Sequence, residues 1–265
     1  PDLPPDARPD RVFVSHTALL DAIRQLPHNI MPQVVLIAEN GDLKEGFDQN
    51  QICSIAENYA DLDIIGVSSN FSCLTGGLPQ IEDVEKLAQT ARKIAKIVQK
   101  PEFLSLGGTV MYDLLKSGRL KNLVQELRMG EGIFFGYNSS KGCKIEELSQ
   151  STAFIQGEIL ETAEKYVENA RHDGFTALGK TTEEPPLTGL RTRAVLDFGV
   201  LAAGKDDLTP ADSRAKLVGQ TFDFTVLDIT DSSEKYFTGG FAEFAANYAS
   251  ASQAMLNPFV TKIIE

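Results

Sequence analysis

The sequence predicts an α/β protein in which a parallel sheet with covering helices is followed by a smaller antiparallel β domain. Three observations support this. Short apolar runs alternate with amphipathic runs through the first half of the chain. Each strand-and-helix unit takes close to the roughly 30 residues that a unit of a (β/α)₈ barrel takes. After about residue 150 the pattern changes to partly alternating extended segments divided by turns. We therefore expect the C-terminal part of a barrel over 1–150 and a β-rich C-terminal domain over 151–265.

The first half contains buried strands paired with amphipathic helices. Continuous apolar runs predict strands, and apolar residues three and four apart predict helices. The clearest helix spans 80–100, and its acids lie early and its lysines late, as the helix dipole favours. The expected strands are 11–16, 33–39, 63–70, 102–108 and one within 123–136, and the expected helices are 17–26, 48–60, 80–100 and 111–118.

The second half contains extended segments and one terminal helix. Partial alternation of apolar and polar residues is typical of antiparallel strands with one solvated face. Asn257 and Pro258 are typical of a helix end and would close the last helix, expected over 248–260. The expected extended segments are 152–161, 190–199, 216–230 and 240–248.

Strands that are apolar throughout and alternate with helices indicate a parallel sheet covered on both faces. A doubly wound open sheet is the alternative to a barrel, but its GxGxxG loop after a first strand is absent. Five units also fall short of eight strands, so either the sheet is open or about three N-terminal units lie outside this sequence. Glycine and polar clusters follow the strands, where a barrel builds its active site. These clusters are Asn40-Gly41-Asp42, Ser68-Ser69-Asn70, Gly107-Gly108-Thr109 and Arg128-Met129-Gly130.

The composition excludes several classes of function. A formal charge of −12 and a pI near 4.8 disfavour nucleic acid as a partner. No apolar stretch is long enough to predict a membrane span. The three cysteines are widely spaced and form no metal or disulfide pattern, which fits a cytoplasmic protein, and the three histidines are too scattered to predict a metal site.

Six segments, in this order, resemble a known family. They are similar to the alanine-racemase N-terminal-domain superfamily, the fold-type III enzymes that use pyridoxal 5′-phosphate (PLP), and most similar to its ornithine-racemase-like branch. The resemblance runs nearly end to end and implies a PLP-type (β/α)₈ TIM barrel, a small β domain and a homodimer. The segments are "AENGDLKEG" (38–46), "IIGVSSNFSCLTGGLPQIEDVEKL" (64–87), "LRMGEGIFFG" (127–136), "LTPAD" (208–212), "TVLDITD" (225–231) and "NYASASQAMLNPFV" (247–260).

The resemblance implies a racemase that exchanges the α-proton of an amino acid bound to PLP. In the family, the first barrel strand bears the lysine that holds PLP as a Schiff base, and the alignment places Pro1 after that strand. Neither Lys180 nor Lys205 is assigned to that role, because both lie in loops of the β domain. The alternatives are a non-catalytic relative that binds PLP or another phosphorylated ligand, and an unrelated phosphate-binding α/β enzyme. The sequence does not identify the amino acid.

Three sets of residues at the strand ends match cofactor-binding positions of the family. Arg128 would face the pyridine nitrogen of PLP and keep it unprotonated; a plain arginine paired with a surface acid is the alternative. The backbone of Gly130 and Glu131 would cradle the phosphate, or form an ordinary tight turn. Gly108 and Thr109 stand where the family has further hydroxyl and amide groups, so phosphate binding there would rest on backbone N–H groups and the Thr109 hydroxyl.

Four further residues are candidates for the site. Asn70 would lie beside the ring, or cap the next segment. Cys73 is a candidate acid or base, or simply a buried thiol. Asp42 would bind the distal amine of a basic amino acid, or belong to a surface turn. Tyr248 would help to hold the phosphate, or pack in the core.

Overall fold

The computed structural model describes residues 8–150, 152–169, 171, 173–181 and 188–264. They form two compact units, divided between Leu148 and Ser149, and each is described by itself. Within the described ranges, no helix combines the length and the apolar character that crossing a membrane requires.

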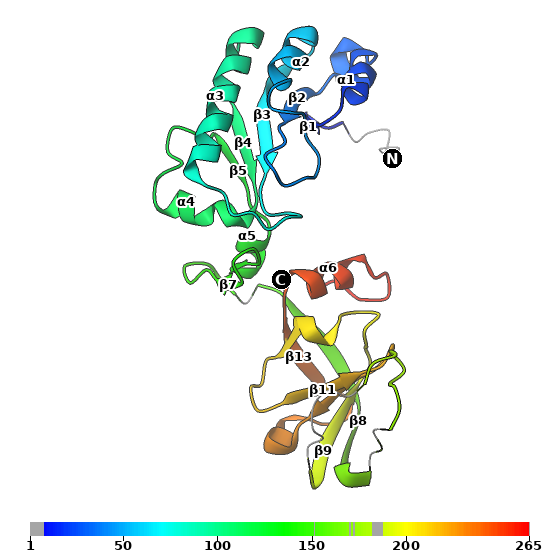
Figure 1. The fold of residues 1–265 in the computed structure, drawn as a ribbon. Helices are drawn as coiled ribbons and strands as arrows, with labels where there is room; N and C mark the ends of the chain where they lie inside the picture. The colour runs from blue at the N-terminus through cyan, green and yellow to red at the C-terminus, as the bar shows by residue number, and fades with distance from the viewer. Residues whose placement is uncertain (1–7, 151, 170, 172, 182–187, 265) are drawn as a thin grey trace. The chain divides into compact units, whose positions relative to one another are not determined.

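The first unit is built on a parallel sheet in the order β1-β2-β3-β4-β5 (Figure 1). Each strand pairs with the next one along the chain. A doubly wound sheet reverses its strand order at a switch point, whereas a barrel keeps chain order, so the barrel prediction is confirmed over the open sheet. The elements are β1 (Arg11–Val14), α1 (Thr17–Arg24), β2 (Gln33–Ile37), α2 (Ile52–Asn58), β3 (Ile64–Asn70), α3 (Ile81–Val98), β4 (Leu104–Gly107), α4 (Tyr112–Lys116), β5 (Glu126–Arg128) and α5 (Glu131–Phe135).

The apolar core of this unit joins one face of the sheet to the helices. Alternate strand residues supply it, and Val34, Leu36, Leu104 and Leu106 are completely buried. Helix α3 packs its apolar stripe against β3 and β4. This face corresponds to the outer, helix-covered face of a barrel.

The opposite face of the sheet is partly polar, which differs from the prediction of strands apolar throughout. Arg11 on β1 and Glu126 on β5 are paired at 2.8 Å, although these are the two outermost strands. A flat sheet would hold strands four spacings apart at about 19 Å, so this sheet is strongly curved. Side chains alternate between its two faces. The concave face carries Arg11, Phe13, Ser68, Asn70, Ser105, Gly107, Glu126 and Arg128.

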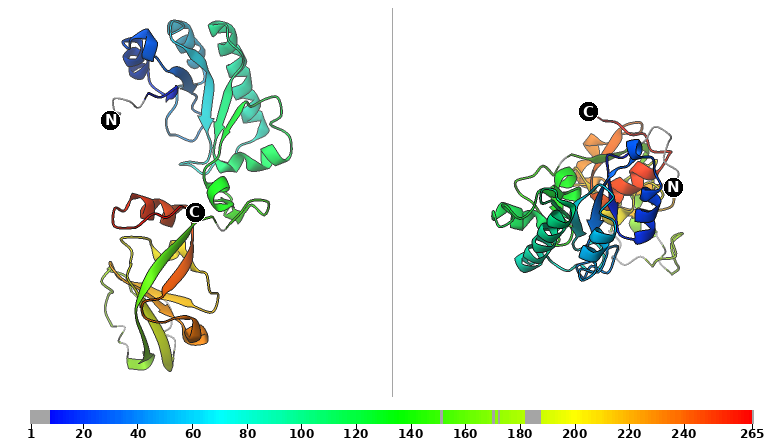
Figure 2. Two further views of the ribbon diagram at one scale, coloured as in Figure 1. Left: turned by 180° about the vertical axis from the view of Figure 1, so that it is seen from behind. Right: turned by 90° about the horizontal axis from the view of Figure 1, so that it is seen from above.

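The second unit is an antiparallel sheet in the order β10-β13-β8-β9-β12-β11, which confirms the predicted β domain. Strand β8, the long green strand in the left view of Figure 2, pairs with both β13 and β9. Strands β10 and β11, at the ends of this order, also contact each other, so the sheet curls nearly closed. The elements are β8 (Phe154–Tyr166), β9 (Leu190–Leu196), β10 (Leu208–Pro210), β11 (Lys216–Gln220), β12 (Thr225–Asp228), β13 (Phe241–Ala246) and α6 (Tyr248–Leu256).

Two details of the element prediction were wrong. The segment 216–230, expected as one extended piece, is the hairpin of β11 and β12. Its turn contains neither glycine nor proline, and the Thr221 hydroxyl holds it by accepting hydrogen bonds from the N–H groups of Asp223 and Phe224. A small hairpin of β6 (Tyr137–Asn138) and β7 (Cys143–Lys144) was not expected.

Candidate functional site

Two adjacent rows of residues cross the concave face near the carboxyl ends of β3, β4 and β5. Residues in register on neighbouring parallel strands form each row, so each strand contributes one residue to each row. The first row is Ser68, Ser105 and Glu126, and the second is Asn70, Gly107 and Arg128.

Arg128 links the two rows. Its Nη1 donates to the hydroxyls of Ser68 at 2.7 Å and Ser105 at 2.8 Å, and its Nη2 donates to Asn70 Oδ1 at 2.8 Å. The guanidinium carbon lies 4.5 Å from the centre of the Phe13 ring. Among the described residues, no carboxylate forms an ion pair with Arg128 and no acceptor bonds its Nε–H. Burial lowers the pKa of Arg128, and the charge of Glu126 opposes this.

Gly107 makes this contact possible. A Cβ atom on Gly107 would lie 2.2 Å from Asn70 Oδ1 and 2.7 Å from Arg128 Nη2. Any side chain there would occupy the space that the hydrogen bond between Asn70 and Arg128 crosses. The glycine is therefore required by the packing of the site, and not by its backbone conformation.

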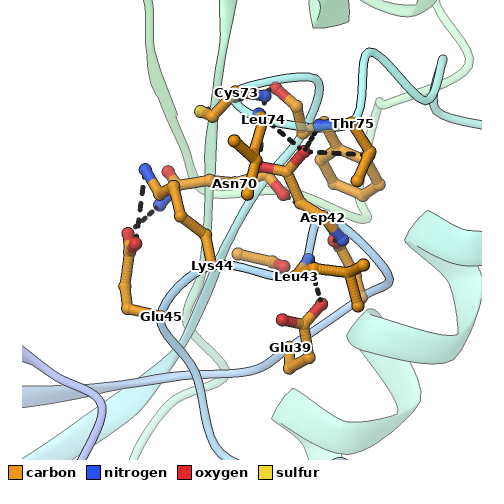
Figure 3. Close-up of polar contacts among 12 residues, drawn as sticks. Glu39, Asp42, Leu43, Lys44, Glu45, Asn70, Cys73, Leu74 and Thr75 are labelled. Atoms are coloured by element: carbon orange, nitrogen blue, oxygen red, sulfur yellow. Dashed lines mark hydrogen bonds and ion pairs between the residues drawn. The ribbon is translucent and has the colours of Figure 1, made fainter.

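Asn70 extends the network to charged groups on the loop after β2 (Figure 3). Its Nδ2 donates to Glu45 at 2.8 Å, and Glu45 also pairs with Lys44 at 3.3 Å. Burial alone lowers the pKa of Lys44, but the interaction with Glu45 and the nearby Cys73 together raise it above its ordinary value. Lys44 is thus protonated at neutral pH, beside an exposed thiol.

Asp42 is buried and holds the loop that carries Cys73 (Figure 3). Its carboxylate accepts hydrogen bonds from the backbone N–H groups of Cys73, Leu74 and Thr75, at 3.1 to 3.2 Å, and from the Thr75 hydroxyl. Burial raises the pKa of Asp42, but these hydrogen bonds together lower it below its ordinary value. In the structure Asp42 supports a loop, and the predicted substrate contact stays a prediction.

Thr109 and the start of α5 meet at the end of β4. The Thr109 hydroxyl is buried and accepts a hydrogen bond from Gly132 N–H at 2.9 Å, which leaves its own proton for another acceptor. The Glu131 carboxylate is occupied by the backbone and hydroxyl of Ser139. The structure therefore brings Thr109 beside the turn at Gly130 to Gly132, as the predicted phosphate cradle requires, while the cradle itself stays a prediction.

Relatives of known identity match most of the chain. It is 28% identical over 243 residues to the lysine racemase of Thermotoga maritima, covering 91% of this chain and 68% of the relative. It is 24% identical over 264 residues to the ornithine racemase of Acetoanaerobium sticklandii, covering 95% and 73%. No family model matches the chain.

Solved structures agree on the fold. The alanine racemase of Streptomyces lavendulae aligns with a TM-score of 0.64 at 14% identity, covering 92% of this chain and 67% of that one. The D-threo-3-hydroxyaspartate dehydratase of Delftia sp. HT23 aligns with a TM-score of 0.57 at 16% identity, covering 93% and 67%. The chain is therefore similar over most of its length to lysine and ornithine racemases, and it has the fold of alanine racemases.

The structure brings several of the predicted site residues together within the first unit. Arg128 donates a hydrogen bond to Asn70. Cys73 follows Asn70 on the loop whose backbone is hydrogen-bonded to Asp42. Tyr248 begins α6 in the second unit, so its predicted contact with a phosphate stays a prediction.

Two residues of the first row, Ser105 and Glu126, were not predicted from the sequence, whereas Ser68 stands in one of the predicted polar clusters. Ser105 stands between Leu104 and Leu106 on β4, and Glu126 and Arg128 stand on either side of Leu127 on β5. That alternation was the available signal, because polar residues at a spacing of two mark one face of a strand. It was obscured by the buried residues of the opposite face.

Proposed function

We propose that this chain supplies the cofactor-binding part of a PLP-dependent amino-acid racemase. The proposal is carried by the position of Arg128 at the end of β5, where neutral acceptors hold its guanidinium by hydrogen bonds. Its retained Nε–H donor suits the unprotonated nitrogen of a pyridine ring. When bound, PLP acidifies the α-carbon of an amino acid, so that the α-proton is exchanged.

The residues present fit this cofactor in three respects. Arg128 has one N–H donor without an acceptor among the described residues. Thr109 keeps a hydroxyl proton that suits a phosphate oxygen, next to the backbone at Gly130 and Glu131. Gly107 leaves room for the hydrogen bond between Arg128 and Asn70, which holds Arg128 in place on the concave face.

We infer a basic amino acid as the substrate. Both sequence relatives are racemases of lysine or ornithine, which carry a distal amine. In this chain Glu45 offers a half-exposed carboxylate that is bonded to Asn70. Asp42 is already occupied by loop amides, so Glu45 suits a distal ammonium better. Cys73 is the candidate acid or base, and Lys44 stands beside it.

A second candidate function is ligand binding without catalysis. Lys44 lies beside Cys73, and its ion pair with Glu45 raises its pKa and so favours the protonated form, which is a poor nucleophile. On this alternative, the chain binds PLP or another phosphorylated ligand but forms no covalent bond to it.

The test combines PLP binding with racemase activity. Titration of the chain with PLP, followed by absorbance, is compared for wild type, Arg128→Ala and the control Arg92→Ala, which removes an exposed arginine paired with Glu102. We expect Arg128→Ala to weaken PLP binding about 10- to 100-fold, the effect of losing a hydrogen bond to a charged group. Equal affinity of the two variants would refute the assignment of Arg128.

Activity separates the two functions. Incubation of the protein that carries the Schiff-base lysine with PLP and L-lysine or L-ornithine, followed by chiral chromatography, should yield the D-enantiomer. PLP binding without any D-enantiomer would support the non-catalytic alternative.

We further propose that the chain forms a homodimer in the cytoplasm. The cysteines Cys53, Cys73 and Cys143 are free, which suits a reducing compartment. Sedimentation equilibrium at micromolar concentration tests the assembly, and a monomer mass would overturn the dimer.

A further inference from the structure

We propose that Ser105 and Glu126 are positioning residues that fix the orientation of the Arg128 guanidinium. Neither residue is among the predicted cofactor contacts. The consequence for PLP rests on the proposed function, whereas the effect on Arg128 itself does not.

The direction of the hydrogen bonds between these three residues is determined by their chemistry. Ser105 is completely buried, and its hydroxyl lies 2.6 Å from Glu126 Oε1 and 2.8 Å from Arg128 Nη1. A carboxylate only accepts and a guanidinium only donates. The single proton of Ser105 must therefore point to Glu126, which turns its lone pairs toward Arg128.

Among the charges that raise the pKa of Arg128, that of Glu126 has the largest effect. It lies two residues before Arg128 on β5, so both side chains project from the same face. Its other oxygen pairs with Arg11 at 2.8 Å, so one acid stands between two cations. The charge of Glu126 opposes the lowering of the Arg128 pKa by burial.

The combined contacts leave Arg128 few orientations. Nη1 is held by Ser68 and Ser105 and Nη2 by Asn70, so rotation about the bond between Nε and the guanidinium carbon breaks several hydrogen bonds at once. Only Nε–H stays without an acceptor among the described residues. Loss of the Glu126 charge weakens the hydrogen bond that Ser105 donates, so the Ser105 hydroxyl can turn its lone pairs away from Arg128.

The first experiment observes Arg128 directly, without cofactor. Nitrogen-15 labelling of arginine gives guanidinium NMR signals, and Arg128→Lys identifies the Arg128 signal by its absence. In wild type we expect slow rotation about the bond between Nε and the guanidinium carbon of Arg128, and slow exchange of the guanidinium protons with water. Glu126→Gln and Ser105→Ala should each accelerate both about tenfold, the effect of losing one charge-assisted hydrogen bond.

The control is Glu147→Gln, which removes an exposed acid paired with Lys116. It should leave the Arg128 signal unchanged. Thermal unfolding is measured on every variant, and Ser105→Ala keeps the proposal testable if Glu126→Gln fails to fold. Wild-type exchange rates in Ser105→Ala would overturn the proposal.

The second experiment connects the orientation to PLP. If wild type binds PLP, Glu126→Gln should weaken binding about tenfold, with Glu147→Gln unchanged. An unchanged affinity for Glu126→Gln would overturn the proposed link to the cofactor. If wild type binds no PLP, the proposed function fails, and the NMR exchange rates still decide the positioning of Arg128.

Discussion

Replacing Asp42 by alanine tests how the loop beside the site is held. The carboxylate accepts three backbone hydrogen bonds from Cys73, Leu74 and Thr75, and it is only 6% exposed. Asp42→Ala removes the acceptor and leaves these three donors to find water. We expect the loop to lose its fixed conformation and the first unit to lose stability.

The magnitude follows from the number and the type of hydrogen bond. A bond to a charged group contributes about 1.5–3 kcal/mol, and separate bonds to one carboxylate are not additive. The exposed side chains of Cys73 and Leu74 indicate that their amides can rehydrate, which limits the cost. We expect a loss of about 2–3 kcal/mol in the free energy of unfolding, or roughly 4–10 °C in melting temperature for a unit of this size.

The pH dependence has a definite sign. The pKa of Asp42 is lower in the folded state than in the unfolded state. The ionised carboxylate therefore contributes its full stabilisation above the unfolded pKa of about 3.9, and this stabilisation is lost as pH falls through the folded pKa. The stability difference between wild type and Asp42→Asn should therefore be constant above about pH 5 and shrink below about pH 4.

Two measurements check this prediction. Thermal unfolding across pH gives the stability, and hydrogen exchange gives the protection of the amides at 73–75. The control Asp113→Ala removes an exposed acid and should change stability by less than about 0.5 kcal/mol. Unchanged amide protection at 73–75 in Asp42→Ala would show that the carboxylate does not hold the loop.

Three further predictions concern space and charge. Gly107→Ala places a Cβ 2.2 Å from Asn70 Oδ1. It should lower the free energy of unfolding, measured in urea, by about 1–3 kcal/mol and weaken PLP binding. Wild-type stability and affinity would contradict the packing argument. Gly66→Ala places a Cβ 2.1 Å from the backbone oxygen of Phe103, which cannot rotate away. Unfolding followed by circular dichroism should therefore show a larger loss of stability than for Gly107→Ala. Asp228→Ala leaves two arginines of β9 without the buried acid that pairs with them. Urea unfolding should show that the free energy of unfolding falls by about 3–5 kcal/mol. A fall of under about 1 kcal/mol would count against the pairing.

Local patterns in the sequence were sufficient for the order and type of most elements. The helix expected over 80–100 is α3 (Ile81–Val98), because its apolar stripe recurs over five turns and dominates any local preference. Parallel pairing followed from strands that alternate with helices. The strand-to-strand order that distinguishes a barrel from an open sheet was not available, since it depends on contacts between distant segments.

Turns held by side chains were harder to predict than turns with glycine or proline. The hairpin within 216–230 is bent by the Thr221 hydroxyl, which bonds two backbone N–H groups further along the chain. The turn conformation gains only one or two side-chain hydrogen bonds over a continuous strand. Local sequence therefore did not separate one long strand from two short ones.

The position of Arg128 was predictable, whereas its partners were not. Its acceptors lie 23, 58 and 60 residues away in sequence, so no spacing identifies them. Sheet register brings them together, because Ser105 and Gly107 on β4 stand opposite Glu126 and Arg128 on β5. A slip of one residue would turn every side chain to the other face.

The apolar core and the polar site are therefore fixed by the same register. Leu104 and Leu106 are completely buried on the helix-covered face, and this requires Ser105 and Gly107 to occupy the concave face between them. A slip of β4 that turned Ser105 away would also turn its two leucines out of the core, at a cost of about 1.5–3 kcal/mol for each. The burial of the two leucines thus also directs the Ser105 hydroxyl toward Glu126 and Arg128.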